Sequence, residues 1–200
     1  MQPQREQSSL TLRIEASRAG VSVIGEDLGT IPEGLRGALE NSGVMGCRVA
    51  MFERDWDGTR EFLRGDAYTP AALASWGTHD LPTWQGWRQG RDIDWRAQLG
   101  EIEDEPRARQ DRAAEVAGFE AVAGGSDLNT LHRFLANCSS TLIAVQGEDL
   151  AGAVEQANLP GTVYEHPNWC RRLPLSISGL ISAPSLRQTA AIMADAGRNG

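Results

Sequence analysis

The sequence predicts an α/β fold with a parallel sheet, because candidate strands alternate with helical segments along the 200 residues. The strands are expected where short runs of β-branched or apolar residues occur, at 21–24, 48–52, 71–76 and 141–145. Four such strands fit an open four-stranded sheet. They fit equally well half of a (β/α)8 barrel, which as a whole usually takes about 250 residues.

Helix signals lie between these strands. Thr30 can cap a helix that has Pro32 and Glu33 in its first turn and ends just before Gly43. A run rich in Ala, Arg and Glu predicts a long helix downstream of the third strand. That long helix is expected at 105–123, and a shorter one at 127–137. A short helical turn is expected at 150–156, after the fourth strand, and a final helix at 185–195.

Composition excludes several classes of function. The net charge of −8 disfavours a nucleic-acid partner, because acidic surfaces repel phosphate backbones. No stretch approaches the roughly 20 apolar residues that a membrane span needs, so neither a membrane partner nor a secreted chain is expected. Three widely separated cysteines and three histidines suggest no metal site, and reduced thiols are typical of a cytoplasmic protein. The expected location is therefore the cytoplasm.

Tryptophan is unusually frequent and clustered. Of six tryptophans, four lie within twenty residues, at Trp76, Trp84, Trp87 and Trp95. Flat indole faces can stack against sugar rings, but they also fill hydrophobic cores. The sequence leaves both interpretations open for each of the four.

Carboxylates follow three of the four candidate strands. The pairs Glu26-Asp27 and Glu148-Asp149, together with Asp80, come directly after or shortly after strand segments. The carboxyl ends of parallel strands form the active-site face of α/β folds, so these side chains are expected at one edge. Paired carboxylates suit glycosidic chemistry, in which one carboxyl acts as general acid and another as nucleophile. The alternative is that they cap the following helices.

Several segments, in order, resemble the 4-α-glucanotransferases, or amylomaltases. VIGEDLGTIPEG at 23–34, GCRVAMFERDWDG at 46–58 and GTHDLPT at 77–83, with WQGWRQGRDI directly after it, resemble three consecutive parts of that family. LHRFLA at 131–136, VQGEDLAG at 145–152 and NLPGTVYEHPNWCRRLPL at 158–175 resemble its terminal segments, and the GTHDLPT form is the one common in proteobacterial members. The resemblance extends over residues 10–195.

The resemblance implies a fold and its domain limits. It favours the carboxy-terminal half of a (β/α)8 barrel, incomplete as given, over the open sheet. Residues 10–175 would belong to the catalytic barrel and residues 176–200 to a helical tail of the same domain, after a poorly ordered start at 1–9.

The resemblance also implies roles for six residues. Glu26 matches the general acid/base, and Asp80 matches the carboxylate that stabilises the transition state. The other four match substrate contacts: Asp27, Phe52, His79 and Asn158. Glu148 matches a segment without a catalytic carboxylate. The implied reaction moves an α-1,4-glucan segment to the 4-hydroxyl of another glucan or of glucose, without metal or organic cofactor. Maltooligosaccharides and starch or glycogen chains are the implied partners.

The family's nucleophile is an aspartate on an earlier strand, and no matching segment is found among the 25 residues before Glu26. The expectation is therefore that this chain is a fragment and is inactive alone. Two alternatives remain from the sequence. One is an α-glucan hydrolase of a related barrel, and the other is a non-catalytic carbohydrate-binding module that uses the tryptophans as platforms.

Overall fold

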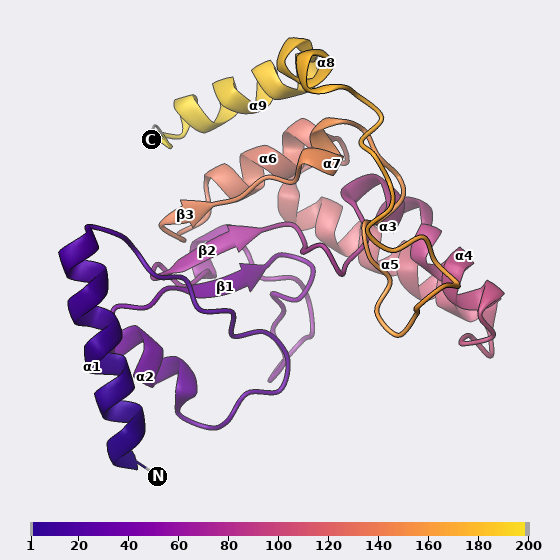
Figure 1. Cartoon of the computed structure of the whole chain (residues 1–200). Helices are drawn as coiled ribbons and strands as arrows, with labels where there is room; N and C mark the ends of the chain where they lie inside the picture. The colour runs from indigo at the N-terminus through magenta and orange to yellow at the C-terminus, as the bar shows by residue number, and fades with distance from the viewer. Residues whose placement is uncertain (1, 199–200) are drawn as a thin grey trace.

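The computed structural model describes residues 2–198, with side chains from residue 10 onward. Short strands occupy the centre, and helices surround them (Figure 1). The elements follow in the order α1 (Gln2–Ala19), α2 (Leu35–Asn41), β1 (Gly46–Val49), the 3-10 helix η1 (Gly65–Ala67), β2 (Ala72–Ser75), α3 (Trp84–Gln89), α4 (Arg91–Gln98), α5 (Glu105–Ala123), α6 (Leu128–Ala136), β3 (Leu142–Ile143), α7 (Gly147–Leu150), α8 (Ile177–Ser182) and α9 (Pro184–Asp195).

The sheet is parallel and its strands lie in chain order. β1 pairs with β2, and β2 pairs with β3, with Gly46 opposite Ala72 and Leu73 opposite Leu142. On the free side of β1, the segment predicted as the first strand contributes a single parallel bridge from Ile24 to Met45. The predicted α/β fold with a parallel sheet is thereby confirmed. All four segments run in the same direction, so their carboxyl ends share one edge.

The clustered tryptophans form the core. Trp76, Trp84 and Trp87 are at most 2% exposed. The ring centroid of Trp76 lies 4.8 Å from that of Trp84, and it lies 5.2 Å from that of Phe119 on α5. Trp95 on α4 is half-buried, and its indole N–H donates to Glu155 at 2.8 Å. The core interpretation is therefore correct for three of the four, and their indole faces are closed to a sugar.

Some helices differ from the prediction at their ends. The first predicted helix does not begin at Thr30 but five residues later, as α2. Gly34 precedes it with φ 79°, a left-handed conformation that no continuous right-handed helix can contain. The helical turn expected at 150–156 instead lies earlier, as α7. Helix α1 includes the backbone of residues 2–9, and the poor order expected for 1–9 stays a prediction.

Other predictions hold closely. Helix α5 has the predicted bounds because Asp104 caps it, accepting from the backbone N–H of Arg107, and Pro106 occupies its first turn. Helix α6 begins after Asp127, which accepts from the N–H of Thr130. Helices α3, α4 and α8 are additions that periodicity did not predict, since each has at most eight residues.

A buried histidine joins the last helix to the rest of the chain. His132 on α6 is 1% exposed, and its Nδ1 lies 2.7 Å from the hydroxyl of Thr189 on α9. The two helices pack along each other (Figure 1). Burial lowers the pKa of His132 from 6.5 to about 4, because the charged imidazolium is poorly solvated there. The neutral ring is therefore the stable form in the folded chain at neutral pH.

This gives a prediction for the pH dependence of stability. Between pH 6.5 and 4 the unfolded chain binds a proton at His132 and the folded chain does not, so this contribution is lost as pH falls. The stability of the wild type relative to a His132→Asn variant should decrease by about 3 kcal/mol from pH 7 to pH 4. Urea unfolding at both pH values measures it. Thr189→Val removes only the hydrogen bond, so above pH 6.5 it should lower the free energy of unfolding by an amount that does not depend on pH. A constant difference between His132→Asn and wild type would contradict the prediction.

Candidate active site

Functional candidates follow each strand segment of the sheet. Phe52 comes three residues after β1, His79 comes four residues after β2, and Glu148 comes five residues after β3. These three lie past the carboxyl ends of their strands. Glu26 comes two residues after the Ile24 bridge, and because Ile24 pairs with Met45, Glu26 lies beside β1 near Cys47.

His79, Asp80 and Asn158 are in direct contact. The side-chain amide of Asn158 donates to Asp80 Oδ1 at 2.6 Å, and the backbone N–H of Asn158 donates to the carbonyl of His79 at 3.2 Å. His79 Nε2 lies 3.4 Å from Asp80 Oδ1. The side chains of His79 and Asp80 remain 61% and 45% exposed, so both can reach a ligand. Asn158, which lies 78 residues beyond Asp80, thus belongs to the same site.

Glu26 and Asp27 face different environments although they are adjacent. Glu26 is exposed, whereas Asp27 is 1% exposed. Successive side chains of an extended segment point to opposite sides, which explains the contrast. Burial raises the pKa of the Cys47 thiol on β1, and the negative charges of Asp27 and Glu26 raise it further. Glu26 is thus held near β1 with its carboxyl group accessible.

Asp27 is the centre of a buried ionic cluster. Its carboxylate accepts from the N–H of Cys47 at 2.7 Å, from Arg48 Nη1 at 2.9 Å and from Arg36 Nε at 3.1 Å. Burial alone would raise the pKa of Asp27, but the Cys47 N–H and the two guanidinium groups outweigh it and hold the pKa below its ordinary value. The sequence expectation was a groove-lining role. Asp27 does line a cavity of about 310 Å3, but its oxygens are bound by protein groups that fix the Glu26 segment on β1, and its contact with substrate stays a prediction.

Asp149 is also buried rather than available. It is 5% exposed, and its carboxylate accepts from the backbone N–H of Trp84 at 2.7 Å. Burial raises the pKa of Asp149 to about 7, and the nearby charge of Glu148 adds to that shift. Asp149 therefore satisfies the first backbone N–H of α3, whose N-cap residue is Thr83, and it does not cap the helix that follows its own strand, the alternative that the sequence left open.

Two exposed aromatic residues follow β1. Phe52 is 42% exposed and Trp56 is 58% exposed. The indole N–H of Trp56 donates to the carbonyl of Phe52 at 3.1 Å, which ties the two together. Phe52 is thus an accessible apolar surface near the carboxyl edge, where the sequence expected a substrate contact.

Trp169 is the site residue that sequence reasoning missed. It is 64% exposed, and its ring centroid lies 5.1 Å from that of His79. Its backbone N–H donates to the carbonyl of Ala157 at 2.9 Å, next to Asn158. The only available signal was its place in the segment 158–175, because sequence cannot distinguish an exposed indole from a buried one.

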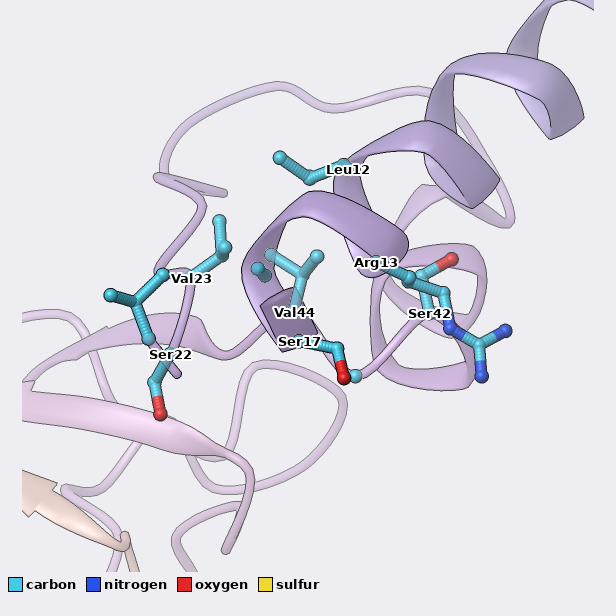
Figure 2. A pocket seen from close by; sticks show the side chains of 10 residues that line it. Leu12, Arg13, Ser17, Ser22, Val23, Ser42 and Val44 are labelled. Atoms are coloured by element: carbon cyan, nitrogen blue, oxygen red, sulfur yellow. The ribbon is translucent and has the colours of Figure 1, made fainter. Parts of the chain in front are cut away.

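A separate pocket lies at the other edge of the sheet. It has a volume of about 220 Å3 and lies between α1 and the segments 21–23 and 42–44, lined by Leu12, Arg13, Val23 and Val44 among others (Figure 2). Those segments precede the Ile24 bridge and β1, so the pocket is at the amino ends of the strands. No candidate catalytic residue lines it.

Among the side chains of residues 10–198, no three from His, Cys, Asp or Glu come together as a metal site would require. Over the same residues, every helix is too short or too polar to cross a bilayer.

Comparison with known proteins identifies relatives of the chain. The 4-alpha-glucanotransferase family matches residues 2–177. The 4-alpha-glucanotransferase of Mycobacterium tuberculosis is 37% identical over 181 residues, covering 82% of this chain and 24% of that protein. The enzyme of the same name from Haemophilus influenzae is 31% identical, covering 94% of this chain and 29% of that protein.

Solved structures give the same result. The amylomaltase of Corynebacterium glutamicum has a TM-score of 0.82 and 29% identity, covering 91% of this chain and 30% of that one. The Streptococcus agalactiae amylomaltase in complex with acarbose has a TM-score of 0.60 at 19% identity, which reflects the fold, covering 92% of this chain and 34% of that one. The chain thus spans about a quarter to a third of the length of its relatives. It belongs to the 4-alpha-glucanotransferase family.

Proposed function

We propose that this chain supplies the general acid/base and the transition-state carboxylate of a 4-α-glucanotransferase. The observation that carries the proposal is that both carboxyls are accessible: Glu26 is exposed beside β1, and Asp80, past the end of β2, is held by Asn158 beside His79. Family membership over residues 2–177 gives these positions their meaning. The substrates are α-1,4-glucans, with glucose or another glucan as acceptor.

The sheet is the second half of a (β/α)8 barrel in this proposal. Three parallel strands and a fourth bridged segment lie in chain order, as consecutive barrel strands do. Their likeness to the Corynebacterium glutamicum amylomaltase supports the assignment. The rest of the barrel would come from the part of the relatives that this chain does not match.

The mechanism is a retaining double displacement. An aspartate from the unmatched part of the barrel attacks the anomeric carbon, and protonated Glu26 donates its proton to the departing oxygen. Glu26 then removes the proton from the 4-hydroxyl of the acceptor, which attacks the glycosyl-enzyme. Such enzymes keep their two reacting carboxyls about 5–5.5 Å apart. Asp80, which His79 and Asn158 orient, binds sugar hydroxyls more tightly as positive charge develops on the ring.

The rival functions depend on different features. A hydrolase of the same barrel class would use the same carboxyls and would differ only in accepting water. The binding-module alternative relied on the clustered tryptophans as platforms, and Trp76, Trp84 and Trp87 are buried. No observation on the described residues favours either alternative over transfer.

The test is transfer by a joined enzyme, defined as residues 10–200 of this chain fused in place of the matching segment of the Corynebacterium glutamicum amylomaltase. With maltotriose it should release glucose and form longer maltodextrins, whereas the 200-residue chain alone should not. Hydrolysis to glucose and maltose without longer products would favour the hydrolase. A folded joined enzyme that leaves maltotriose unchanged would contradict the proposal.

Asp80→Asn should lower kcat/KM of the joined enzyme about 10²–10³-fold, because the amide keeps the shape but not the charge opposite the developing cation. Glu33→Gln, a change at an exposed carboxyl outside the site, is the matched control and should leave kcat/KM within about threefold. Maltotriose disproportionation measures both. Equal effects of the two substitutions would contradict the assignment of Asp80.

A further inference from the structure

Trp169 combines two properties that do not favour folding. Its indole is 64% exposed, so it contributes little to the core. Its backbone has φ 60°, in the left-handed region that bulky residues rarely adopt. Glycine or asparagine would adopt this conformation more readily. An exposed indole on a left-handed backbone therefore points to a role outside the core, since such outliers persist where surrounding structure holds them for function.

A polar clamp holds this conformation. The side chain of Asn168 donates to the hydroxyl and the carbonyl of Thr162 at 2.8 and 3.1 Å, which fixes the orientation of its amide. Its oxygen then accepts from the N–H of Leu159 at 2.9 Å and faces Nδ1 of buried His166 at 2.7 Å. These contacts fix the residue immediately before Trp169. Together with the Trp169 N–H, which donates to the carbonyl of Ala157, they hold the backbone that carries the indole.

The Trp169 indole lies beside both the candidate site and a groove. One neighbour is His79, whose ring centroid lies 5.1 Å away and which contacts Asp80. On another side, Trp169 lines a groove of about 490 Å3 that extends along 153–157 and 171–174. Glu148 and Arg172 add polar groups to that groove. Trp169 thus lies between the His79–Asp80 pair and an open groove with apolar and polar walls.

We propose that Trp169 is a stacking platform for the glucose unit next to the one that His79 and Asp80 hold, and that the glucan continues from it into this groove. Sugar rings present apolar C–H faces that pack on an indole, while their hydroxyls reach the groove's polar groups. The inference rests on the proposed function for its ligand class. It adds a specificity-determining residue that favours longer glucans.

The 200-residue chain itself provides the test, through its binding of maltoheptaose. His79 is exposed, whereas His132 and His166 are 1% exposed, so the ring resonances of His79 report ligand binding in NMR titrations. Trp169→Gly should raise the dissociation constant for maltoheptaose about 10- to 100-fold, because the sugar ring loses the apolar surface that it packs against. Trp169→Phe should keep it within about threefold. For glucose, which cannot reach the platform from His79, the two variants should not differ.

Controls separate binding from folding. Trp169→Gly should melt no lower than the wild type, because glycine accepts the left-handed backbone without strain. Tyr164→Ala removes an aromatic ring that is 94% exposed in the same segment and should leave maltoheptaose binding unchanged. Unchanged affinity in Trp169→Gly, equal losses in the Gly and Phe variants, or wild-type His79 resonances that do not move would each overturn the inference. Failure of transfer by the joined enzyme would instead count against the proposed function, since transfer is not measured here.

Discussion

Replacing Glu26 by glutamine is expected to lower glucan transfer by the joined enzyme about 10²–10⁴-fold, the range typical of a lost general acid/base. An amide of nearly the same shape can neither donate a proton to the leaving oxygen nor take one from the acceptor. Glu26 is exposed, so the substitution should leave the melting temperature unchanged. The rate of maltotriose disproportionation is the measurement.

The nature of the leaving group makes this prediction specific. A maltosyl fluoride donor needs no proton to depart, so formation of the glycosyl-enzyme should recover in Glu26→Gln while transfer to a glucan acceptor remains slow. Glu33→Gln changes another exposed carboxyl group, seven residues further along, and should have no effect on either step. If Glu26→Gln and Glu33→Gln behave alike with maltotriose, Glu26 is not the acid/base.

Asp27→Ala is expected to destabilise the chain by about 3–5 kcal/mol, because it leaves the buried guanidinium of Arg48 without its carboxylate. The Arg48 side chain is 10% exposed, so solvent screens the charge that is left behind only weakly. Arg36, with a side chain 58% exposed, contributes an ion pair near the surface, and Arg36→Ala should cost at most about 1 kcal/mol. Urea unfolding at pH 7 measures all three free energies.

A double-mutant cycle isolates the pair. Arg48→Met removes the buried charge, so Asp27→Ala combined with Arg48→Met should be clearly less destabilised than the sum of the single variants. Because the pKa of Asp27 is lowered in the folded chain, its contribution is present above pH 3.8 and is lost as pH falls through the folded pKa. Strict additivity at pH 7 would show that the pair is not coupled.

The fold class could be predicted because it depends on local patterns. The long helix α5 has its expected bounds since a capping aspartate, an early proline and a following glycine, Gly124, all lie within its own sequence. The start of α2 was predicted less accurately. Thr30 is a good capping residue, but Gly34 adopts a left-handed conformation that interrupts the helix.

The site was predictable where strand ends decide it, and not where distant contacts do. Position after a strand was sufficient to single out Glu26 and Asp80 as candidates, and their convergence on one cleft stays a prediction. Which member of the Glu26-Asp27 pair is buried depends on Arg48, 21 residues beyond Asp27. Similarly, the burial of Trp76 and the exposure of Trp169 depend on tertiary packing, because residue type alone does not distinguish the two tryptophans.

The central claim is that Glu26 and Asp80 act on the same sugar ring, and a crystal structure of the joined enzyme with acarbose tests it most directly. Acarbose is the ligand in the Streptococcus agalactiae amylomaltase structure, which shares this fold. The expected result is one ring of acarbose with Asp80 and His79 bound to its hydroxyls and the carboxyl of Glu26 at the adjoining glycosidic linkage. Acarbose bound elsewhere, or a ring that contacts Asp80 while Glu26 faces solvent away from it, would contradict the claim.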